Sequence, residues 1–203
     1  MKKLLLASAL LIAGLYSAQD AGLKGKWYAT AQVGFSQQKE GEVKGSSFNV
    51  LPIVGTFVSP DVTVGLAFGY IKNTIKAGDT TTQDLGVFAI EPLVRKYWNI
   101  SGPFYFFGQL GAPILFGKES ESENKLSQFG LAASAGFDVV VWKNVSFEFS
   151  YNIINFSSTT LDPDAPGAEK TTTTNFQIAH VADAGLDYTG LLSPISVGVK
   201  FLF

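Results

Sequence analysis

The sequence contains no cysteine and a single histidine, His180. Without cysteine there is no disulfide framework, cysteine-based zinc site or thiol nucleophile, and one histidine excludes a multi-histidine metal site. Charged residues are also scarce, at 16% against about 25% in typical soluble domains, and no basic patch indicates nucleic-acid binding. After the first residues, no stretch approaches the roughly 20 apolar residues that a membrane helix needs. A helical membrane protein is therefore not expected.

Apolar and aromatic residues, in contrast, are abundant. The 203 residues are 46% hydrophobic and 13% aromatic, and 17 of them are Phe. A chain of this length forms one domain or at most two small ones, and its apolar content argues against disorder. Because no long apolar run exists beyond the N-terminus, these residues must be spread along the whole chain.

The first 18 residues have the pattern of a cleaved secretory signal peptide. Lys2 and Lys3 form a positive region, an apolar run follows over residues 4–15, and Ala18 is a small residue suited to cleavage. The apolar run is shorter than a membrane anchor requires. We therefore predict a signal peptide over residues 1–18 and a single mature domain over residues 19–203.

From Trp27 onward, apolar residues recur at every second position, which is the spacing of a β-strand with two different faces. At the start of this region, Trp27 and Phe35 share one face, opposite Thr30 and Gln32. The alternation predicts eight strands, over residues 27–36, 47–57, 62–70, 83–98, 104–116, 128–141, 145–153 and 191–203.

The lengths of the strands and of their connections indicate a membrane barrel. Strands in globular sheets usually have about 5 to 6 residues, whereas a tilted strand crosses a bilayer in about 9 to 11. Short turns near residues 59, 100 and 143 alternate with long polar loops near 41, 77 and 121 and from 165 onward. Outer-membrane barrels have short periplasmic turns and long external loops. We predict an all-β, eight-stranded, antiparallel up-and-down transmembrane β-barrel with both termini in the periplasm.

Residues 157–190 are the least regular part of this pattern. They contain the runs Asp162-Pro163-Asp164 and Ala165-Pro166-Gly167, which are typical of loops. We interpret them as one long external loop. Within it, residues 176–182 form either a short extra strand above the membrane or an extension of the eighth strand.

Alternation alone does not distinguish a membrane barrel, which is apolar outside, from a soluble lipocalin-like barrel, which is apolar inside. Two features favour the membrane barrel. The charges are concentrated in the predicted loops and not along the strands. In addition, Trp27, Trp98 and Trp142 all lie at strand ends beside the predicted periplasmic turns or terminus. Core packing gives no reason for this common end, so we predict a periplasmic-side aromatic girdle.

The last eight residues place a polar residue, a glycine two positions later, and aromatic residues at the third-last and last positions. This pattern resembles the C-terminal β-signal that is recognised by the assembly machinery of the outer membrane. The resemblance assigns the motif positions to Ser196, Gly198, Phe201 and Phe203.

Residues 57–65 and 91–98 resemble the second-to-third and the fourth strand segments of the small outer-membrane β-barrel family related to OmpX and to the OmpA transmembrane region. The resemblance covers residues 26–203 as a loose pattern. It implies an integral protein of the bacterial outer membrane, with its external loops at the cell surface. The implied partners are outer-membrane lipid, lipopolysaccharide and the barrel assembly machinery, and a monomer is expected.

A group of charged residues is predicted to point into the lumen: Glu91, Arg95, Asp138, Glu148 and Lys200. Because a buried charge is costly unless it is paired, we expect these side chains to form an ion network. A turn centred on Lys143 places Asp138 directly opposite Glu148, where two carboxylates repel each other unless a cation lies between them. Glu91 and Arg95 lie about 13 Å apart along one strand, at about 3.3 Å per residue, and are expected to pair across strands.

Enzymatic interpretations find less support. The two facing carboxylates would suit acid–base catalysis, but a closed lumen offers a substrate no route. Lipid A deacylases would require a Ser two residues after the His, whereas Val181 and Ala182 follow His180. A triad of His180, Asp183 and a nearby Ser would lie in the predicted loop, and we interpret the acidic run 119–123 as solvated.

We therefore predict no catalytic residue, no cofactor and no metal site. The predicted function is non-enzymatic: membrane integrity, or adhesion and binding at the surface through the external loops. Two alternatives stay open, a narrow pore or transporter for small solutes and a soluble lipocalin-like ligand-binding barrel.

Overall fold

The computed structural model describes residues 23–120, 124–165, 167–178 and 195–203. The predicted signal peptide, His180 and Asp183 lie outside these residues. Among the described residues, no helix is long and apolar enough to cross a membrane. The strands are β1 (Trp27–Glu40), β2 (Val43–Phe57), β3 (Val62–Ala77), β4 (Thr80–Ser101), β5 (Phe104–Gly111), β6 (Ile114–Glu119), β7 (Lys125–Trp142), β8 (Val145–Asp162), β9 (Thr171–Ile178) and β10 (Ile195–Leu202).

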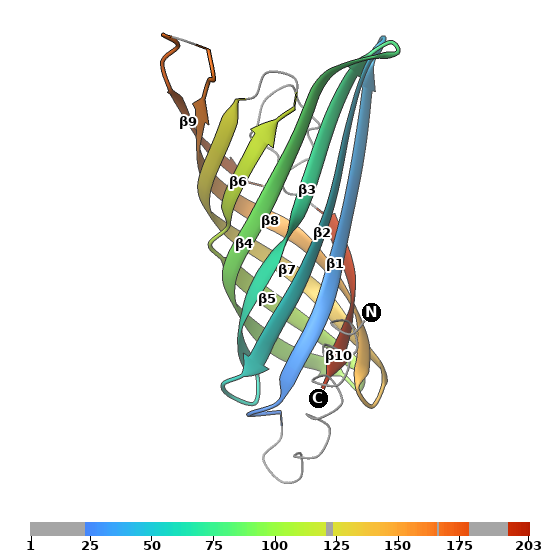
Figure 1. The fold of residues 1–203 in the computed structure, drawn as a ribbon. Helices are drawn as coiled ribbons and strands as arrows, with labels where there is room; N and C mark the ends of the chain where they lie inside the picture. The colour runs from blue at the N-terminus through green and yellow to red at the C-terminus, as the bar shows by residue number, and fades with distance from the viewer. Residues whose placement is uncertain (1–22, 121–123, 166, 179–194) are drawn as a thin grey trace, which may run out of the picture.

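The strands form one antiparallel sheet that closes into a ring (Figure 1). Each strand from β1 to β4 pairs with the next, and β10 closes the ring by pairing with both β1 and β8. β5 and β6 both lie between β4 and β7, so they form one barrel strand that is interrupted at Ala112 and Pro113. Pro113 has no amide hydrogen to donate to the ladder. The ring therefore has eight strand positions, as the alternation predicted.

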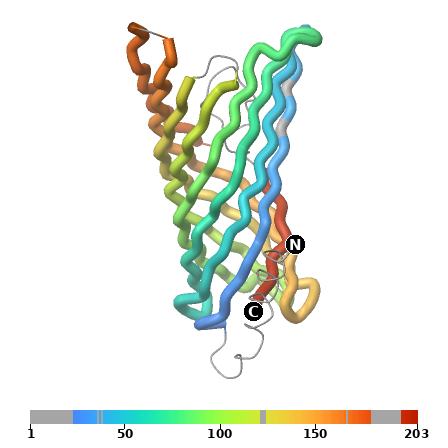
Figure 2. The backbone as a smooth tube through the Cα atoms, in the orientation of Figure 1, coloured from blue at the N-terminus to red at the C-terminus, as the bar shows by residue number. Residues whose placement is uncertain are grey.

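The described chain enters and leaves the ring at the same end. The amide of Trp27 donates a hydrogen bond to the carbonyl of Phe203 (2.8 Å), and the amide of Phe203 donates one to the carbonyl of Trp27 (2.9 Å). The β2–β3, β4–β5 and β7–β8 turns lie at this end, which is at the bottom of Figures 1 and 2 and which we call the terminal end. The tips of the β1–β2 and β3–β4 hairpins lie together at the opposite end, called the hairpin end.

The prediction of long polar loops near residues 41 and 77 is wrong. The strands continue through these stretches as paired ladders, to Glu40↔Val43 in one hairpin and Ala77↔Thr80 in the other. Gly41 (φ 60°) and Gly78 (φ 59°) occupy the first position of the two-residue turns, where a positive φ is needed. Antiparallel pairing satisfies the backbone whatever the polarity of the side chains, so the loss of alternation did not mark the ends of the strands.

The predicted loop over residues 157–190 also contains regular structure. β8 runs to Asp162, and β9 pairs with it in the register Ile154↔Ile178 to Leu161↔Thr171. The resulting hairpin extends beyond the ring at the hairpin end (orange in Figure 1). The expected extra strand is thus present, but it starts at Thr171 and pairs with β8. Residues 179–182 of that prediction lie outside the described part.

The outer surface of the ring carries an apolar band. Large side chains predicted to face lipid are about half to two-thirds exposed: Phe35 at 65%, Phe88 at 67%, Leu110 at 61% and Phe201 at 51%. Neighbours in sequence such as Val87, Ala89 and Lys200 point inward and are buried. A soluble barrel would bury these large apolar side chains and expose polar ones. The orientation of the two faces is therefore that of a membrane barrel.

The lumen has one apolar wall and one polar wall. β2, β3, β4 and β6 contribute buried Leu51, Ile71, Val87 and Leu115, whereas β7 and β8 contribute polar residues including Asn152. A membrane barrel that is apolar outside is expected to turn polar side chains inward, as it does with Thr30 and Gln32, and this expectation is wrong for the first wall. Space enclosed on all sides favours close apolar packing, as in a soluble core. This apolar layer lies on the hairpin-end side of Glu91.

An exposed ion pair joins Asp61, in the turn between β2 and β3, to Lys96 of β4. Lys96, and after it the hydroxyl of Ser59, lowers the pKa of the Asp61 carboxyl below its usual value. A carboxyl group whose pKa is lowered on folding stabilises the folded barrel at pH values above its pKa in the unfolded chain. This stabilisation is lost as the pH falls through the pKa of the folded state. We expect Lys96→Gln to raise the pKa of Asp61 toward its usual value in a carbon-13 NMR titration. An unchanged Asp61 pKa would contradict the pair.

Candidate functional site

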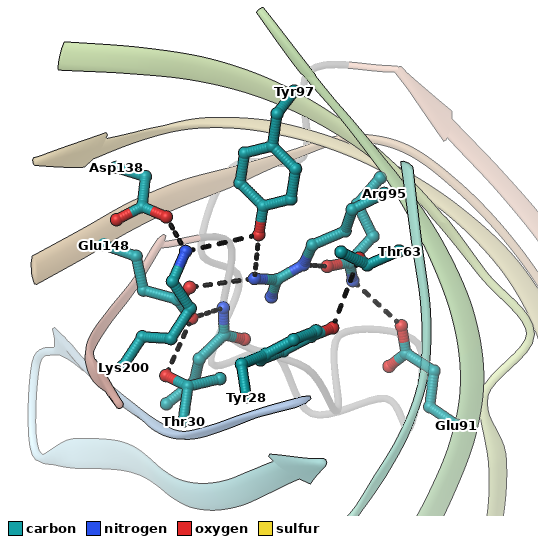
Figure 3. A network of polar contacts seen from close by, with 11 residues as sticks. Tyr28, Thr30, Thr63, Glu91, Arg95, Tyr97, Asp138, Glu148 and Lys200 are labelled. Atoms are coloured by element: carbon teal, nitrogen blue, oxygen red, sulfur yellow. Dashed lines mark hydrogen bonds and ion pairs between the residues drawn. The ribbon is translucent and has the colours of Figure 1, made fainter. Parts of the chain in front are cut away.

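The terminal half of the lumen is filled by charged side chains from four strands (Figure 3). Glu91 and Arg95 come from β4, Asp138 from β7, Glu148 from β8 and Lys200 from β10. All five side chains point inward, and none is more than 7% exposed. Period-two strands explain this placement, because each residue lies on the face opposite the apolar outer band.

Arg95 and Glu148 form the central ion pair of the group. Arg95 Nη1 donates to Glu148 Oε2 at 2.8 Å, and both side chains are fully buried. The other carboxylate oxygen, Glu148 Oε1, accepts hydrogen bonds from Thr30 Oγ1 (3.1 Å) and Gln32 Nε2 (2.8 Å) of β1. The guanidinium of Arg95 also lies 4.8 Å from the centroid of the Phe107 ring. The pair therefore connects β1, β4, β5 and β8 across the lumen.

Lys200 and Asp138 form a second buried ion pair. Lys200 Nζ contacts Asp138 Oδ2, and both side chains are 3% exposed. The same ammonium lies 4.8 Å from the centroid of the Tyr97 ring and donates to the Tyr97 hydroxyl at 3.5 Å. Arg95 Nη1 also lies 3.5 Å from that hydroxyl. Tyr97 thus joins the two ion pairs into one network.

Asp138 lies directly opposite Glu148 in the β7–β8 ladder, the register that the Lys143 turn predicted. Each carboxylate has its own cation, Lys200 for Asp138 and Arg95 for Glu148, which offsets the repulsion between them. In the next ladder, Gly198 lies opposite Glu148. A Cβ atom on Gly198 would lie 3.2 Å from Glu148 Cγ and 2.9 Å from the carbonyl oxygen of Ala31. The glycine leaves room for the carboxylate that binds Arg95.

Glu91 is linked to the network through a neutral amide. Gln109 Nε2 donates to Glu91 Oε1 at 3.2 Å, and Gln109 Oε1 accepts from Arg95 Nε. Arg95 therefore pairs across strands as predicted. Glu91 does not, because in the described part of the chain its hydrogen-bond partner is an amide and not a cation.

A chain of aromatic rings borders the network toward the terminal end. Ring centroids are 6.1 Å apart for Tyr28 and Phe57, 5.8 Å for Phe57 and Tyr97, and 5.7 Å for Tyr97 and Phe107. The Tyr28 hydroxyl lies 3.4 Å from Thr63 Oγ1. The rings give the charged groups a low-dielectric surrounding, which strengthens each ion pair.

Sequence reasoning missed the uncharged members of the network: Thr30, Gln32, Tyr97 and Gln109. Each lies on the inner face that alternation assigned to its strand, so this position could have marked it as a candidate member of the network. The contacts of Thr30 and Gln32 with Glu148 depend on the register between strands far apart in sequence. That register is not visible in a single strand.

The predicted girdle residues lie at the terminal end, whereas the predicted β-signal runs along β10 from the level of Ser150 to the terminal end. Trp27, Trp98 and Trp142 are 52%, 48% and 75% exposed, so none is a core residue. Ser196, Gly198 and Phe201 lie on β10, and Phe203 follows it. Recognition of these four residues by an assembly machinery stays a prediction.

Known proteins give the context for this barrel. The family model described as outer membrane protein beta-barrel domain matches residues 5–182, which is most of the chain. Two similar structures are the outer membrane protein OprG from Pseudomonas aeruginosa and Neisserial surface protein A (NspA). OprG has a TM-score of 0.53 and 16% identity, with 90% of this chain and 98% of that chain covered. NspA has a TM-score of 0.53 and 13% identity, with 89% and 100% covered.

At these identities the likeness to the two structures concerns the fold alone. No curated protein matches the sequence. The family model, the ring of eight strand positions and the apolar outer band lead to the same assignment. The chain belongs to the outer membrane protein beta-barrel domain family.

Proposed function

We propose that this protein is a non-enzymatic, closed barrel of the bacterial outer membrane that acts in membrane integrity or in binding at the cell surface. The observation that carries the proposal is the packed lumen. Two buried ion pairs and a chain of aromatic rings fill its terminal half, and an apolar layer follows toward the hairpin end. Because Asp138 and Glu148 are each paired with a cation, neither of these carboxylates is free to act as a general acid or base.

The cavities also favour a closed barrel over a narrow pore. A cavity of about 380 Å³ at the terminal end is bounded by Tyr97, Asp138 and Lys200, which belong to the network. On the other side of the network, the cavity beside Glu91 is only about 50 Å³, space for an ion or one or two waters. The narrowing from about 380 Å³ to about 50 Å³ on the two sides of the network supports a closed lumen.

The surface role rests on the hairpin end. The β1–β2, β3–β4 and β8–β9 hairpins extend beyond the apolar band and carry mostly polar side chains there, including Lys39, Lys44 and Thr173 (Figure 1). We place this end outside the cell and the terminal end in the periplasm. The outer band then contacts lipid and lipopolysaccharide, Ser196, Gly198, Phe201 and Phe203 serve the assembly machinery, and the protein acts as a monomer.

Planar bilayers test the closed lumen. We expect the purified barrel to show no steady ion conductance under conditions in which a wide-lumen porin, added to the same bilayer as a control, opens channels. The reason is that eight strands leave an interior that side chains fill. Heat-modifiable gel mobility of the same sample shows that the barrel is folded. Substantial steady conductance from folded protein would overturn the proposal in favour of a pore.

A further inference from the structure

A small cavity lies in the lumen next to the ion network, on its hairpin-end side. It has a volume of about 50 Å³, and its lining includes Asn49 of β2, Glu91 of β4, Ser134 of β7, and Ser150 and Asn152 of β8. Four strands thus bring carboxylate, amide and hydroxyl groups to one small cavity. The cavity lies beyond Gln109 from Arg95, so it is outside the two ion pairs already described.

The buried charges of the network do not balance. Three carboxylates, Glu91, Asp138 and Glu148, face two cations, Arg95 and Lys200, which leaves a net charge of −1. Asp138 and Glu148 each have a cation, so the excess negative charge belongs to Glu91. Its partner among the described side chains, Gln109, is neutral. An uncompensated carboxylate in a low-dielectric interior is strongly unfavourable, so it calls for one further positive charge.

Two other oxygen atoms at the cavity lack partners. Asn49 Oδ1 and Asn152 Oδ1 are buried and accept no hydrogen bond within the described residues. The two side chains are 1% and 7% exposed. Buried polar atoms are nearly always paired, so two amide oxygens without partners beside a carboxylate that has no cation indicate a common ligand. These groups, with the hydroxyls of Ser134 and Ser150, are the hard oxygen donors that alkali and alkaline-earth cations prefer.

The charge and the size of the site select the cation. Calcium sites draw on several carboxylates, whereas this cavity has one, and among the described residues no three His, Cys, Asp or Glu side chains are placed so that they could hold a metal ion together. A single positive charge neutralises the network, and a double charge would reverse its sign. We infer that the cavity formed by Asn49, Glu91 and Asn152 is a binding site for one monovalent, oxygen-preferring cation of the sodium class.

Thermal unfolding in two salts tests the site. The folded barrel in nonionic detergent at pH 8 is compared in NaCl and in choline chloride at equal ionic strength, since choline is too large for a cavity of about 50 Å³. We expect a higher unfolding temperature in NaCl that rises with the logarithm of its concentration, because a ligand of the folded state stabilises by mass action. The difference between the salts should disappear in Glu91→Gln.

Two further variants keep the test decisive. Asp84→Asn, which removes a partly buried carboxylate of β4 that pairs with Lys72 outside the cavity, should keep the sodium response and serves as the matched control. Asn152→Ala, which keeps Glu91, should require several-fold more Na⁺ for the same rise in unfolding temperature. This variant tests the site even if Glu91→Gln does not fold. Equal unfolding temperatures in the two salts, as expected for a protonated Glu91 with bound water, would overturn the site. So would a response that persists in Glu91→Gln or one that only Ca²⁺ produces.

The inference does not depend on the proposed function. Conductance measurements examine whether ions pass through the lumen, and the salt comparison examines whether one ion rests in it. A closed barrel without a sodium response would overturn the cation site and leave the proposed function intact.

Discussion

Arg95→Ala should lower the free energy of unfolding of the barrel by about 3 to 5 kcal/mol, the cost of leaving a buried charge without its partner. The variant keeps Glu148 in a fully buried position and removes its cation. Urea unfolding in detergent, followed by tryptophan fluorescence and by heat-modifiable mobility, measures the change. Lys96→Ala is the control, because the Lys96–Asp61 pair is 40% and 46% exposed and such pairs contribute at most about 1 kcal/mol.

A double-mutant cycle separates the ion pair from the loss of packing. Glu148→Ala alone should also lower the unfolding temperature, since it leaves Arg95 without its carboxylate. The double variant Arg95→Ala, Glu148→Ala should cost less than the sum of the single variants, because neither charge is then left uncompensated. Unchanged stability of Glu148→Ala, or strict additivity in the cycle, would contradict the network.

Leu110→Arg should lower the free energy of unfolding in a lipid bilayer by about 2 to 4 kcal/mol. This is the destabilisation caused by a charge near the midplane on the lipid face of a barrel, and it depends on depth in the membrane. Leu110 is 61% exposed. It lies between Phe106, which pairs with Trp98 at the terminal end, and Phe116, which pairs with Phe88 toward the hairpin end. The Leu110 side chain is therefore placed near the middle of the apolar band.

Reversible unfolding from lipid vesicles measures this cost. Val141→Arg provides the matched control, because Val141 is similarly exposed, at 54%, but adjoins Trp142 at the edge of the band. Arginine there should cost about 0 to 1 kcal/mol. Equal costs at the two positions would contradict the placement of the band in the membrane. A soluble barrel would tolerate both substitutions, since surface charge is solvated.

Closure of the sheet explains why so much of the barrel was predictable. A ring has one inside and one outside, so every strand must alternate, and Trp27, Phe88 and Leu110 could be assigned to the outer face from sequence alone. The pairing of Asp138 with Glu148 was predicted correctly, but the two-residue turn at Lys143 and Asn144 does not by itself produce it. That turn pairs Trp142 with Val145, and a register shift between Val140 and Trp142 then places Asp138 opposite Glu148 and not opposite Phe149.

Other features depend on contacts between distant strands. The choice of Lys200 for Asp138 and of Arg95 for Glu148 follows from the β10–β8 ladder and from the reach of β4 across the lumen. Gln109, which separates Glu91 from Arg95, does not belong to this class, because it lies opposite Arg95 in the ladder between the consecutive strands β4 and β5. The hairpins beyond the membrane were missed for a different reason: in water both faces of a strand accept polar residues, so Lys39 and Lys44 gave no alternation to detect.

The network combines residues from both ends of the chain, and this affects the order in which the barrel assembles. Pairing along β1 to β4 joins neighbours in sequence, whereas the last seam joins Tyr28 to Leu202 and so requires the whole chain to be in place. Contacts of such long sequence separation form late because their loop-closure entropy is large. Lys200 lies on β10, which pairs with β8 as well as with β1. Until this last strand has joined β8, Asp138 lacks its counter-charge. We therefore expect water to stay around Asp138 until β10 is in place, so that drying of this part of the lumen is a late event of barrel formation.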